Sequence, residues 1–282
     1  MKLSKNELKS NIKMAAFDVD GTIMAFGHPE FTVKMKETFS DLAKNHIYSI
    51  IASAREFVTI GNFLEQLPTL DYFIGANGMF IYDYKNKKML YEKPMKYDEM
   101  MLIYQNILND PNCEGFNIVD LKNVYYSDGM NIDTWFLKPH QAKLKPMSQI
   151  EEIDKEHIHI ITLSSYDEQT TEALAQKVEK IIAEHNLDLE VNSRWHKGLF
   201  VAPKGISKFN ALEILAQKLN LSASKNLIAF GDSGNDYEMI ENAAYGVRVG
   251  NHDEHLKTIA DDAAMNPIDD GVYYKLKELN LI

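Results

Sequence analysis

The most constraining feature of the chain is a short apolar run that ends in two closely spaced carboxylates. Residues 12–17 read Ile-Lys-Met-Ala-Ala-Phe, which is typical of a buried strand, and Asp18 and Asp20 follow at once. In open α/β sheets, ligands bind outside the carboxyl ends of the strands. Two carboxylates placed there repel each other and lose hydration unless a cation offsets their charge. The pattern therefore predicts an α/β protein with a cation site at the end of this strand.

Short apolar strands alternate with helical segments on both sides of the chain. We expect strands at 12–17, 48–52, 72–74, 227–230 and 246–249. We expect helices at 30–45, 55–66, 206–219, 235–242, 252–260 and 272–279. This alternation predicts an α/β fold with a Rossmann-like, doubly wound parallel sheet that carries helices on both faces.

The middle of the chain has a different pattern. After a hairpin at 79–91, it predicts helices at 97–108 and 168–185 and strands at 116–119, 124–126, 157–164 and 188–192. Mixed short strands and helices favour an inserted α+β domain with an antiparallel sheet. We therefore assign residues 1–83 and 198–282 to the α/β core and residues 84–197 to the insertion, a division that suits a chain of 282 residues.

Composition limits the compartment and the partners. The net charge of −11 does not favour nucleic acid or an anionic membrane as a partner. Residues 1–13 are polar and lack the apolar centre of a signal peptide, and no apolar run approaches the ~20 residues of a membrane span. The single cysteine, Cys113, excludes an internal disulfide. We expect a cytoplasmic protein.

Four polar motifs lie at predicted strand ends or helix starts. They are Asp18-Val19-Asp20-Gly21-Thr22, Ala52-Ser53-Ala54-Arg55, Gly205-Ile206-Ser207-Lys208 and Gly231-Asp232-Ser233-Gly234-Asn235-Asp236. Each of the first three motifs alone is explained as well by a turn, a helix cap or a solvated lysine. The fourth is more specific, because a turn or a helix cap explains either Asp232 or Asp236 but hardly both together with Asn235. The shared position of the four motifs at the carboxyl edge of the sheet favours one common site.

The residue types suit phosphoryl transfer through an aspartyl intermediate. Asp18 is the predicted nucleophile, because a carboxylate that attacks phosphorus splits hydrolysis into two easier steps. Asp20 is the predicted acid and base, which protonates the leaving oxygen and later activates water. We assign binding of the phosphorylated substrate to Thr22, Ser53, Arg55, Lys208 and Asn235, and count Ser53 and Lys208 with the catalytic group.

The same motifs predict a magnesium site. Mg²⁺ prefers oxygen ligands, usually one or two carboxylates together with water and substrate phosphate. We assign the ligands to Asp18, the backbone carbonyl of Asp20, and Asp232. Asp236 follows Asp232 by one helical turn and is predicted to orient a metal-bound water.

The order of these motifs resembles the haloacid dehalogenase superfamily, in its Cof-type subclass IIB of phosphatases. That family has a DxDGT motif, a Ser/Thr motif, a Lys motif and a GDxxND motif, with a large α+β cap between the second and third. The resemblance covers nearly the whole chain and extends to Asn77-Gly78, Gly250-Asn251 and Asp270-Gly271-Val272. It implies a C2-type cap at 84–197. It also implies the same nucleophile, acid/base, phosphate-binding and metal roles for Asp18, Asp20, Ser53, Lys208 and Asp232.

One departure from the family pattern stands in the second motif. The family commonly has Ala-Thr-Gly-Arg where this chain has Ala52-Ser53-Ala54-Arg55. Serine keeps the hydroxyl, so phosphate binding is expected to survive. Alanine in place of glycine restricts the local backbone.

These observations predict a Mg²⁺-dependent phosphatase of small metabolites such as sugar phosphates, pyridoxal phosphate or flavin mononucleotide. A phosphomutase of the same superfamily is an alternative that the residues do not separate from it. A non-catalytic binding or regulatory module on this fold is another, although the presence of both Asp18 and Asp20 argues against it.

Residues of the insertion are expected to set substrate specificity. The candidates are Trp135, His140, Tyr166, Arg194, Trp195 and His196, each of which is also a plausible packing residue of that domain. His157 and His159 alternate along a predicted strand and have the spacing of a metal pair. Because the sequence offers no third ligand nearby, we expect them to face solvent.

Overall fold

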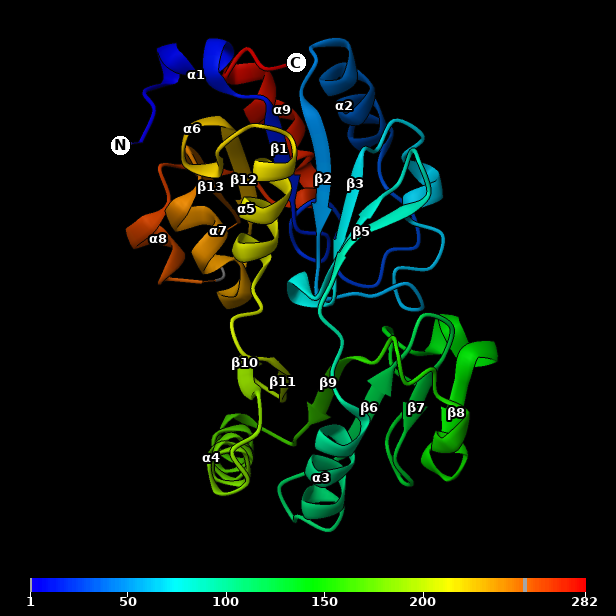
Figure 1. Cartoon of the computed structure of the whole chain (residues 1–282). Coiled ribbons are helices and arrows are strands. Elements are labelled where there is room, and N and C mark those ends of the chain that lie inside the picture. Colours follow the sequence, from blue (N-terminus) through cyan, green and yellow to red (C-terminus); the bar gives the residue numbers. More distant parts are fainter. Residues whose placement is uncertain (1, 251–252) are drawn as a thin grey trace. The chain divides into compact units, whose positions relative to one another are not determined.

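The computed structural model describes residues 2–250 and 253–282, which form two compact units (Figure 1). The first unit comprises the described parts of Met1–Ala54, Asn62–Tyr91 and Ser207–Ile282. The second comprises Arg55–Gly61 and Glu92–Ile206. Asn251, from one of the segments that resemble the family, and the first residue of the helix expected at 252–260 lie outside the described residues.

The first unit contains a mostly parallel sheet with the strand order β14-β13-β12-β1-β2-β3-β4-β5. The strands are β1 (Met14–Phe17), β2 (Tyr48–Ala52), β3 (Tyr72–Gly75), β4 (Phe80–Asp83), β5 (Lys88–Glu92), β12 (Leu227–Gly231), β13 (Tyr245–Val249) and β14 (Asp262–Ala264). Neighbours from β14 to β3 run parallel, and β4 is antiparallel to β3. The strand order reverses at β1, which lies between β2 and β12. Such a switch point is where open α/β sheets bind their ligands.

Helices cover both faces of this sheet. They are α1 (Lys5–Asn11), α2 (Val33–Lys44), α5 (Lys208–Lys218), α6 (Ala223–Asn226), α7 (Tyr237–Asn242), α8 (Leu256–Ile259) and α9 (Gly271–Glu278), with 3₁₀ turns η1 (Leu64–Gln66), η2 (Ala76–Gly78), η5 (Gly234–Asp236) and η6 (Pro267–Asp269). Alternate residues of β1 serve the two faces, since Met14 joins the core with Leu212 of α5, whereas the ring of Phe17 lies 5.4 Å from that of Phe39 in α2. The predicted doubly wound α/β fold is confirmed.

The second unit combines a sheet with two helices. Its strand order is β10-β11-β9-β6-β7-β8, antiparallel except for the parallel pair β7 and β8. The strands are β6 (Gly115–Val119), β7 (Val124–Tyr126), β8 (Leu144–Pro146), β9 (His159–Ser164), β10 (Leu189–Trp195) and β11 (Gly198–Pro203). The helices are α3 (Tyr97–Ile107) and α4 (Glu168–Glu184), with 3₁₀ turns η3 (Lys138–Lys143) and η4 (Met147–Glu152).

The helix expected at 55–66 is wrong. This segment forms turns and the short η1, because the carboxylate of Glu56 accepts hydrogen bonds from the backbone N–H groups of Val58 and Thr59. Gly61 then has a positive φ of 56°, which ends any helical path. A side chain that binds nearby N–H groups offers the backbone an alternative to the helix.

The boundaries between the units also differ from the expected ones at residues 84 and 197. The strand β5 (Lys88–Glu92) pairs into the sheet of the first unit, and β11 (Gly198–Pro203) pairs with β9 and β10 of the second. Strand pairing therefore moves both boundaries about one strand further along the chain.

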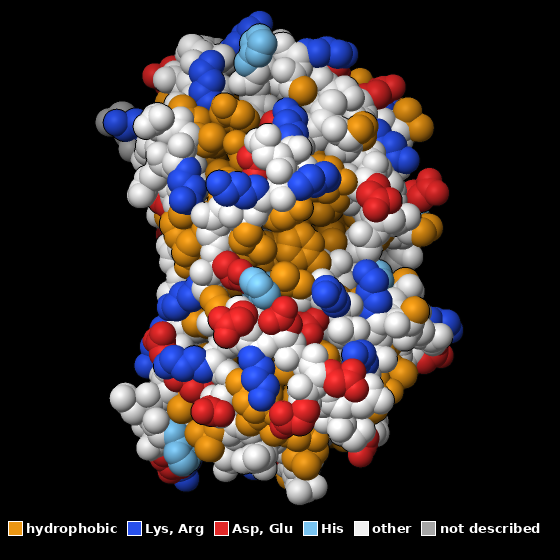
Figure 2. All heavy atoms as spheres, turned by 45° about the vertical axis from the view of Figure 1, so that its right-hand side comes forward, with side chains coloured by type: hydrophobic (Ala, Val, Ile, Leu, Met, Phe, Trp, Pro, Cys, Tyr) orange, Lys and Arg blue, Asp and Glu red, His pale blue; other side chains and the backbone are white. Residues whose placement is uncertain are grey.

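The face shown in Figure 2 carries both charged side chains and a group of hydrophobic ones in the upper half of the view. Acidic and basic side chains are interspersed on this face (Figure 2). None of the helices in residues 2–250 and 253–282 is long and apolar enough to cross a membrane.

Candidate active site

The site lies where β1 and β12 end side by side. Their register pairs Phe17 with Phe230, and the backbone N–H of Asp18 donates to the carbonyl oxygen of Phe230 at 3.0 Å. Parallel pairing therefore places Asp18 and Asp232, each one residue beyond its strand, at the same edge of the sheet. Both are buried, with exposed fractions of 6% and 4%.

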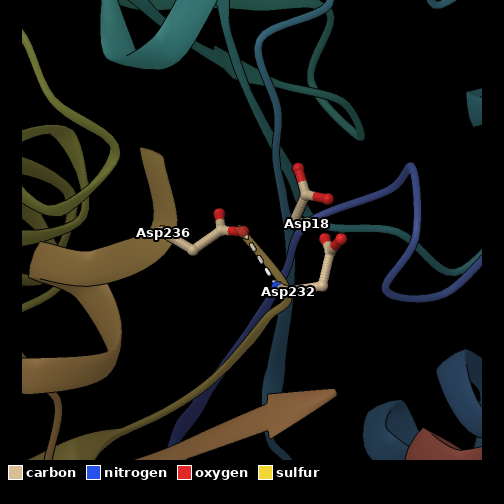
Figure 3. A group of neighbouring side chains, drawn as sticks. All are labelled: Asp18, Asp232 and Asp236. Atoms are coloured by element: carbon tan, nitrogen blue, oxygen red, sulfur yellow. Dashed lines mark hydrogen bonds between the residues drawn. The ribbon is translucent and has the colours of Figure 1, made fainter. Parts of the chain in front are cut away.

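Three carboxylates gather at this edge (Figure 3). Asp18, Asp232 and Asp236 each offer an oxygen, and these oxygens lie within 4.8 Å of one another. Asp236 ends the turn η5, and its Oδ2 accepts a hydrogen bond from the backbone N–H of Asp232 at 3.0 Å, the dashed line in the figure. The sequence motifs predicted that these three residues share one site, and in the structure they lie together.

Lys208 places a single positive charge against this cluster. It is the first residue of α5, follows the N-cap Ser207, and has an exposed fraction of 1%. Its Nζ lies 2.6 Å from Oδ1 of Asp18 and 2.7 Å from Oδ1 of Asp236. Burial alone would lower the pKa of Lys208, but the two carboxylates raise it above its ordinary value, so the side chain is an ammonium.

The cluster nevertheless keeps an excess of negative charge. Burial raises the pKa of Asp18 and of Asp232 well above the ordinary carboxyl range; Lys208 opposes this in both, and the charge of Asp236 adds to it. With all three carboxylates ionised, the cluster would carry two negative charges more than the one ammonium balances, and the raised pKa values of Asp18 and Asp232 reflect burial together with this repulsion. Oxygen ligands with this charge deficit fit a hard divalent cation.

The turn after Asp18 supports Asp232. Gly21 has a φ of 90°, and a Cβ at this position would lie 2.4 Å from Oδ2 of Asp232, so only glycine fits. The hydroxyl of Thr22 donates to Oδ1 of Asp232 at 2.9 Å. Thr22 therefore orients a candidate metal ligand, and its role in substrate binding stays a prediction. Asp20, on the same turn, is half-buried.

Ser53 and Asn235 are connected through a residue to which sequence reasoning gave no role. Ser53 follows β2, is buried, and its carbonyl oxygen accepts from the backbone N–H of Asn77 at 3.0 Å. The side-chain Nδ2 of Asn235 donates to Oδ1 of Asn77 at 3.0 Å. The Asn-Gly pair at 77–78 signals a turn with positive φ in the sequence, but nothing there reveals its contact with Asn235.

Arg55 belongs to the second unit. Its Nη1 donates to the carbonyl oxygen of Thr59, and its guanidinium lies 4.8 Å from the ring centre of Phe136 and 5.5 Å from that of Trp135. The side chain is buried there, and its part in substrate binding stays a prediction.

The expectation of solvent-facing histidines in the second unit is wrong. His159 is fully buried, and its Nε2 lies 2.8 Å from Oε1 of Glu92. His157 is half-buried, and its Nδ1 lies 2.8 Å from the same oxygen. Glu92 precedes the pair by more than 60 residues in the chain, which is why the local sequence pattern did not reveal it.

Two of the predicted specificity residues have partners within the second unit. The ring of Trp195 lies 4.6 Å from that of Phe200, and Arg194 forms ion pairs with Glu172 and Glu179. Their contact with substrate stays a prediction.

Comparison with known protein families assigns the chain to one of them. A family model described as haloacid dehalogenase-like hydrolase matches residues 15–276. The chain belongs to the haloacid dehalogenase-like hydrolases. The match spans both units and all four polar motifs, so the resemblance noted in the sequence is confirmed. This haloacid dehalogenase-like hydrolase is therefore an enzyme.

Individual relatives of this haloacid dehalogenase-like hydrolase are similar over most of their length. The pyridoxal phosphate phosphatase YbhA of Escherichia coli is 27% identical, with 88% of this chain and 91% of the relative covered. The 5-amino-6-(5-phospho-D-ribitylamino)uracil phosphatase YcsE of Bacillus subtilis is 24% identical, with 93% of each covered.

Solved structures share the fold. The HAD subclass IIB sugar phosphatase BT4131 superposes with a TM-score of 0.79 at 18% identity, covering 96% of this chain and 100% of the other. A haloacid dehalogenase-like hydrolase from Bacteroides thetaiotaomicron reaches a TM-score of 0.81 at 21% identity, covering 95% and 99%.

Proposed function

We propose that this HAD-type phosphatase hydrolyses phosphomonoesters of small metabolites with Mg²⁺ and through a phosphorylated Asp18. The observation that carries the proposal is the buried cluster in which Lys208 binds Asp18 and Asp236 beside Asp232. Such a cluster has a nucleophile, a fixed positive charge and a cation site within one network, which are the parts that phosphoryl transfer needs.

The chain's own residues account for both halves of the reaction. The free oxygen of Asp18 attacks phosphorus, and the bond from phosphorus to the ester oxygen breaks as Asp20 donates a proton to that oxygen. Asp20 then takes a proton from a water molecule that attacks the same phosphorus, and the acyl-phosphate bond breaks to release orthophosphate and restore Asp18. Lys208 holds Asp18 in one orientation throughout, because its Nζ bonds Oδ1 of that carboxylate.

Magnesium completes the charge balance in this proposal. The ion would be held by Asp18, Asp232 and the backbone carbonyl of Asp20. Asp236 would support this set indirectly, because its carboxylate accepts a hydrogen bond from the backbone N–H of Asp232. When bound, Mg²⁺ would neutralise the phosphate oxygens as charge develops on them.

Small phosphorylated metabolites are the proposed substrates. The relatives named above are phosphatases of pyridoxal phosphate and of a phosphoribityl-aminouracil, both of which are small phosphorylated compounds with a ring. The net charge of −11 supports neither nucleic acid nor an anionic membrane as a partner, and a cytoplasmic location agrees with the single thiol. In this proposal the second unit is the cap domain, and its residues set the substrate specificity.

Phosphate release tests the proposed function directly. We expect orthophosphate to appear from a panel of sugar phosphates, pyridoxal phosphate and flavin mononucleotide when Mg²⁺ is present, and not when EDTA replaces it. No release from any compound by folded, Mg²⁺-loaded protein would reject the phosphatase assignment.

Mg²⁺ is expected to raise the unfolding temperature, and to raise it more at pH 8 than at pH 6. Because the pKa values of Asp18 and Asp232 are raised in the folded protein, the metal-free folded state holds more protons than the unfolded state above the ordinary carboxyl range. The free energy of unfolding of metal-free protein therefore falls as pH rises toward neutral. Metal binds the deprotonated ligands, so its stabilising effect grows in the same direction.

Differential scanning fluorimetry with and without Mg²⁺ measures this effect. The control is Asp232→Asn, which keeps an oxygen to accept from Thr22 but loses the charge. If Mg²⁺ raised the unfolding temperature equally in the wild type and in this variant, Asp232 would not be a ligand of the metal.

A further inference from the structure

The turn between β3 and β4 has an unusual backbone. Ala76 and Asn77 have φ values of 50° and 54°, and Gly78 has a φ of 108°. For residues other than glycine, this left-handed region costs about 1 kcal/mol or more per residue. Two such residues in succession persist only where the surrounding structure fixes them, and such strain concentrates at functional sites.

The turn contacts three separate parts of the phosphate site. The backbone N–H of Asn77 donates to the carbonyl oxygen of Ser53, and its Oδ1 accepts from Nδ2 of Asn235. At Gly78 a Cβ would lie 2.2 Å from the carbonyl oxygen of Ser207, the residue before Lys208. Asn77 itself is only 1% exposed, so these contacts are made away from bulk solvent.

The contacts fix the orientation of the Asn235 amide. Its Oδ1 accepts from the hydroxyl of Ser233 at 2.8 Å, and one N–H of its Nδ2 donates to Asn77. An amide has two N–H donors, so both ends are set and the second N–H has a defined direction. Without the acceptor on Asn77, the amide of this half-buried residue would rotate and bond water.

We infer that Asn77 is a positioning residue of the phosphate site, which acts by orienting Asn235 and by fixing the peptide of Ser53. The inference rests on the proposed function, since it assumes that Ser53 and Asn235 bind the phosphate group. Asparagine suits this place because it tolerates positive φ better than most residues and carries a neutral acceptor. Glycine also adopts a positive φ but has no side-chain acceptor. An Asn77→Gly variant therefore separates the backbone conformation of this position from its hydrogen bond to Asn235.

The test compares Asn77→Gly with Asn235→Ala and with the double variant. We expect each single variant to raise KM for the best substrate, and the inhibition constant of orthophosphate, about 10-fold, the effect of one hydrogen bond to a charged group. We expect kcat to stay within about threefold and cooperative thermal unfolding to persist. The double variant should be no worse than Asn235→Ala, because Asn77→Gly keeps the backbone N–H that donates to Ser53 and loses only the side-chain acceptor that acts through Asn235.

Asn220→Gly is the matched control. Asn220 also has a positive φ, 57°, but it is exposed after the end of α5. This variant should leave KM and the orthophosphate constant unchanged, which separates loss of the amide from a general effect of glycine.

Two results would overturn the inference: unchanged constants in Asn77→Gly, or effects of Asn77→Gly and Asn235→Ala that multiply in the double variant. Inactivity of the wild type would reject the proposed function instead. The inference would then be judged by calorimetric binding of orthophosphate, which must weaken in Asn77→Gly and not in Asn220→Gly if it is correct.

Discussion

Asp18→Asn is expected to abolish phosphate release and at the same time to stabilise the metal-free protein. The amide oxygen of asparagine does not attack phosphorus, so we expect turnover to fall by a factor on the order of 10³ or more. The environment of Asp18 disfavours its charge, since burial and the neighbouring carboxylates raise its pKa despite Lys208. Asparagine removes that charge with little change of shape. At pH 8, metal-free Asp18→Asn should therefore unfold at a higher temperature than the wild type.

Phosphate assays and thermal unfolding in EDTA measure the two effects. Asp188→Asn, at an exposed position in the second unit, should change neither. Retained turnover in Asp18→Asn would remove Asp18 from the role of nucleophile. A lower unfolding temperature would mean that the ion pair with Lys208 outweighs the repulsion within the cluster.

Lys208→Met is expected to cause the largest loss of stability of any single change at the site. Its ammonium is the buried partner of both Asp18 and Asp236. Removing one partner of a buried ionic network leaves uncompensated charge, which typically costs about 3–5 kcal/mol. Turnover should also be lost, because the nucleophile loses the group that orients it and the incoming phosphate loses a positive charge.

Urea unfolding of three variants distinguishes charge from packing. Lys218→Met, at the exposed end of the same helix, should leave the free energy of unfolding nearly unchanged. Adding Asp236→Asn to Lys208→Met should restore part of the lost stability and none of the activity, since it removes one unpaired charge. If the double variant is no more stable than Lys208→Met, the loss comes from packing of the lysine stem instead.

Patterns of apolar residues in the sequence predicted most strands of the first sheet, because burial of a strand depends mainly on its own residues. β1, β2 and β12 are largely apolar runs in the sequence, and in the structure every residue of these strands is buried except the first residue of β2, Tyr48. The helix expected at 55–66 failed because one side chain, Glu56, bonds backbone N–H groups that a helix would use. Residue propensities do not reveal such a competition.

The same distinction holds for the site. Asp18, Asp232, Asp236 and Lys208 were predicted together because strand order brings the carboxyl ends of β1 and β12 to one edge. The pair formed by Asn77 and Asn235 joins residues 158 positions apart, and its hydrogen bond depends on the exact path of a turn. The local sequence around Asn77 does not show that its side chain meets Asn235. The inference about Asn77 therefore depends on the structure.

The position of β1 has a consequence for synthesis of the chain. Its neighbour β12 ends at Gly231, so one long side of β1 has no partner until more than 200 further residues have been translated. At about 5–20 residues per second, that interval lasts on the order of 10–40 s. During it, Glu92–Ile206 emerge, a segment whose strands pair with one another in the sheet of the second unit. Until β12 is made, the edge of β1 that later pairs with it presents unpaired backbone N–H and C=O groups, which are able to pair with a wrong strand.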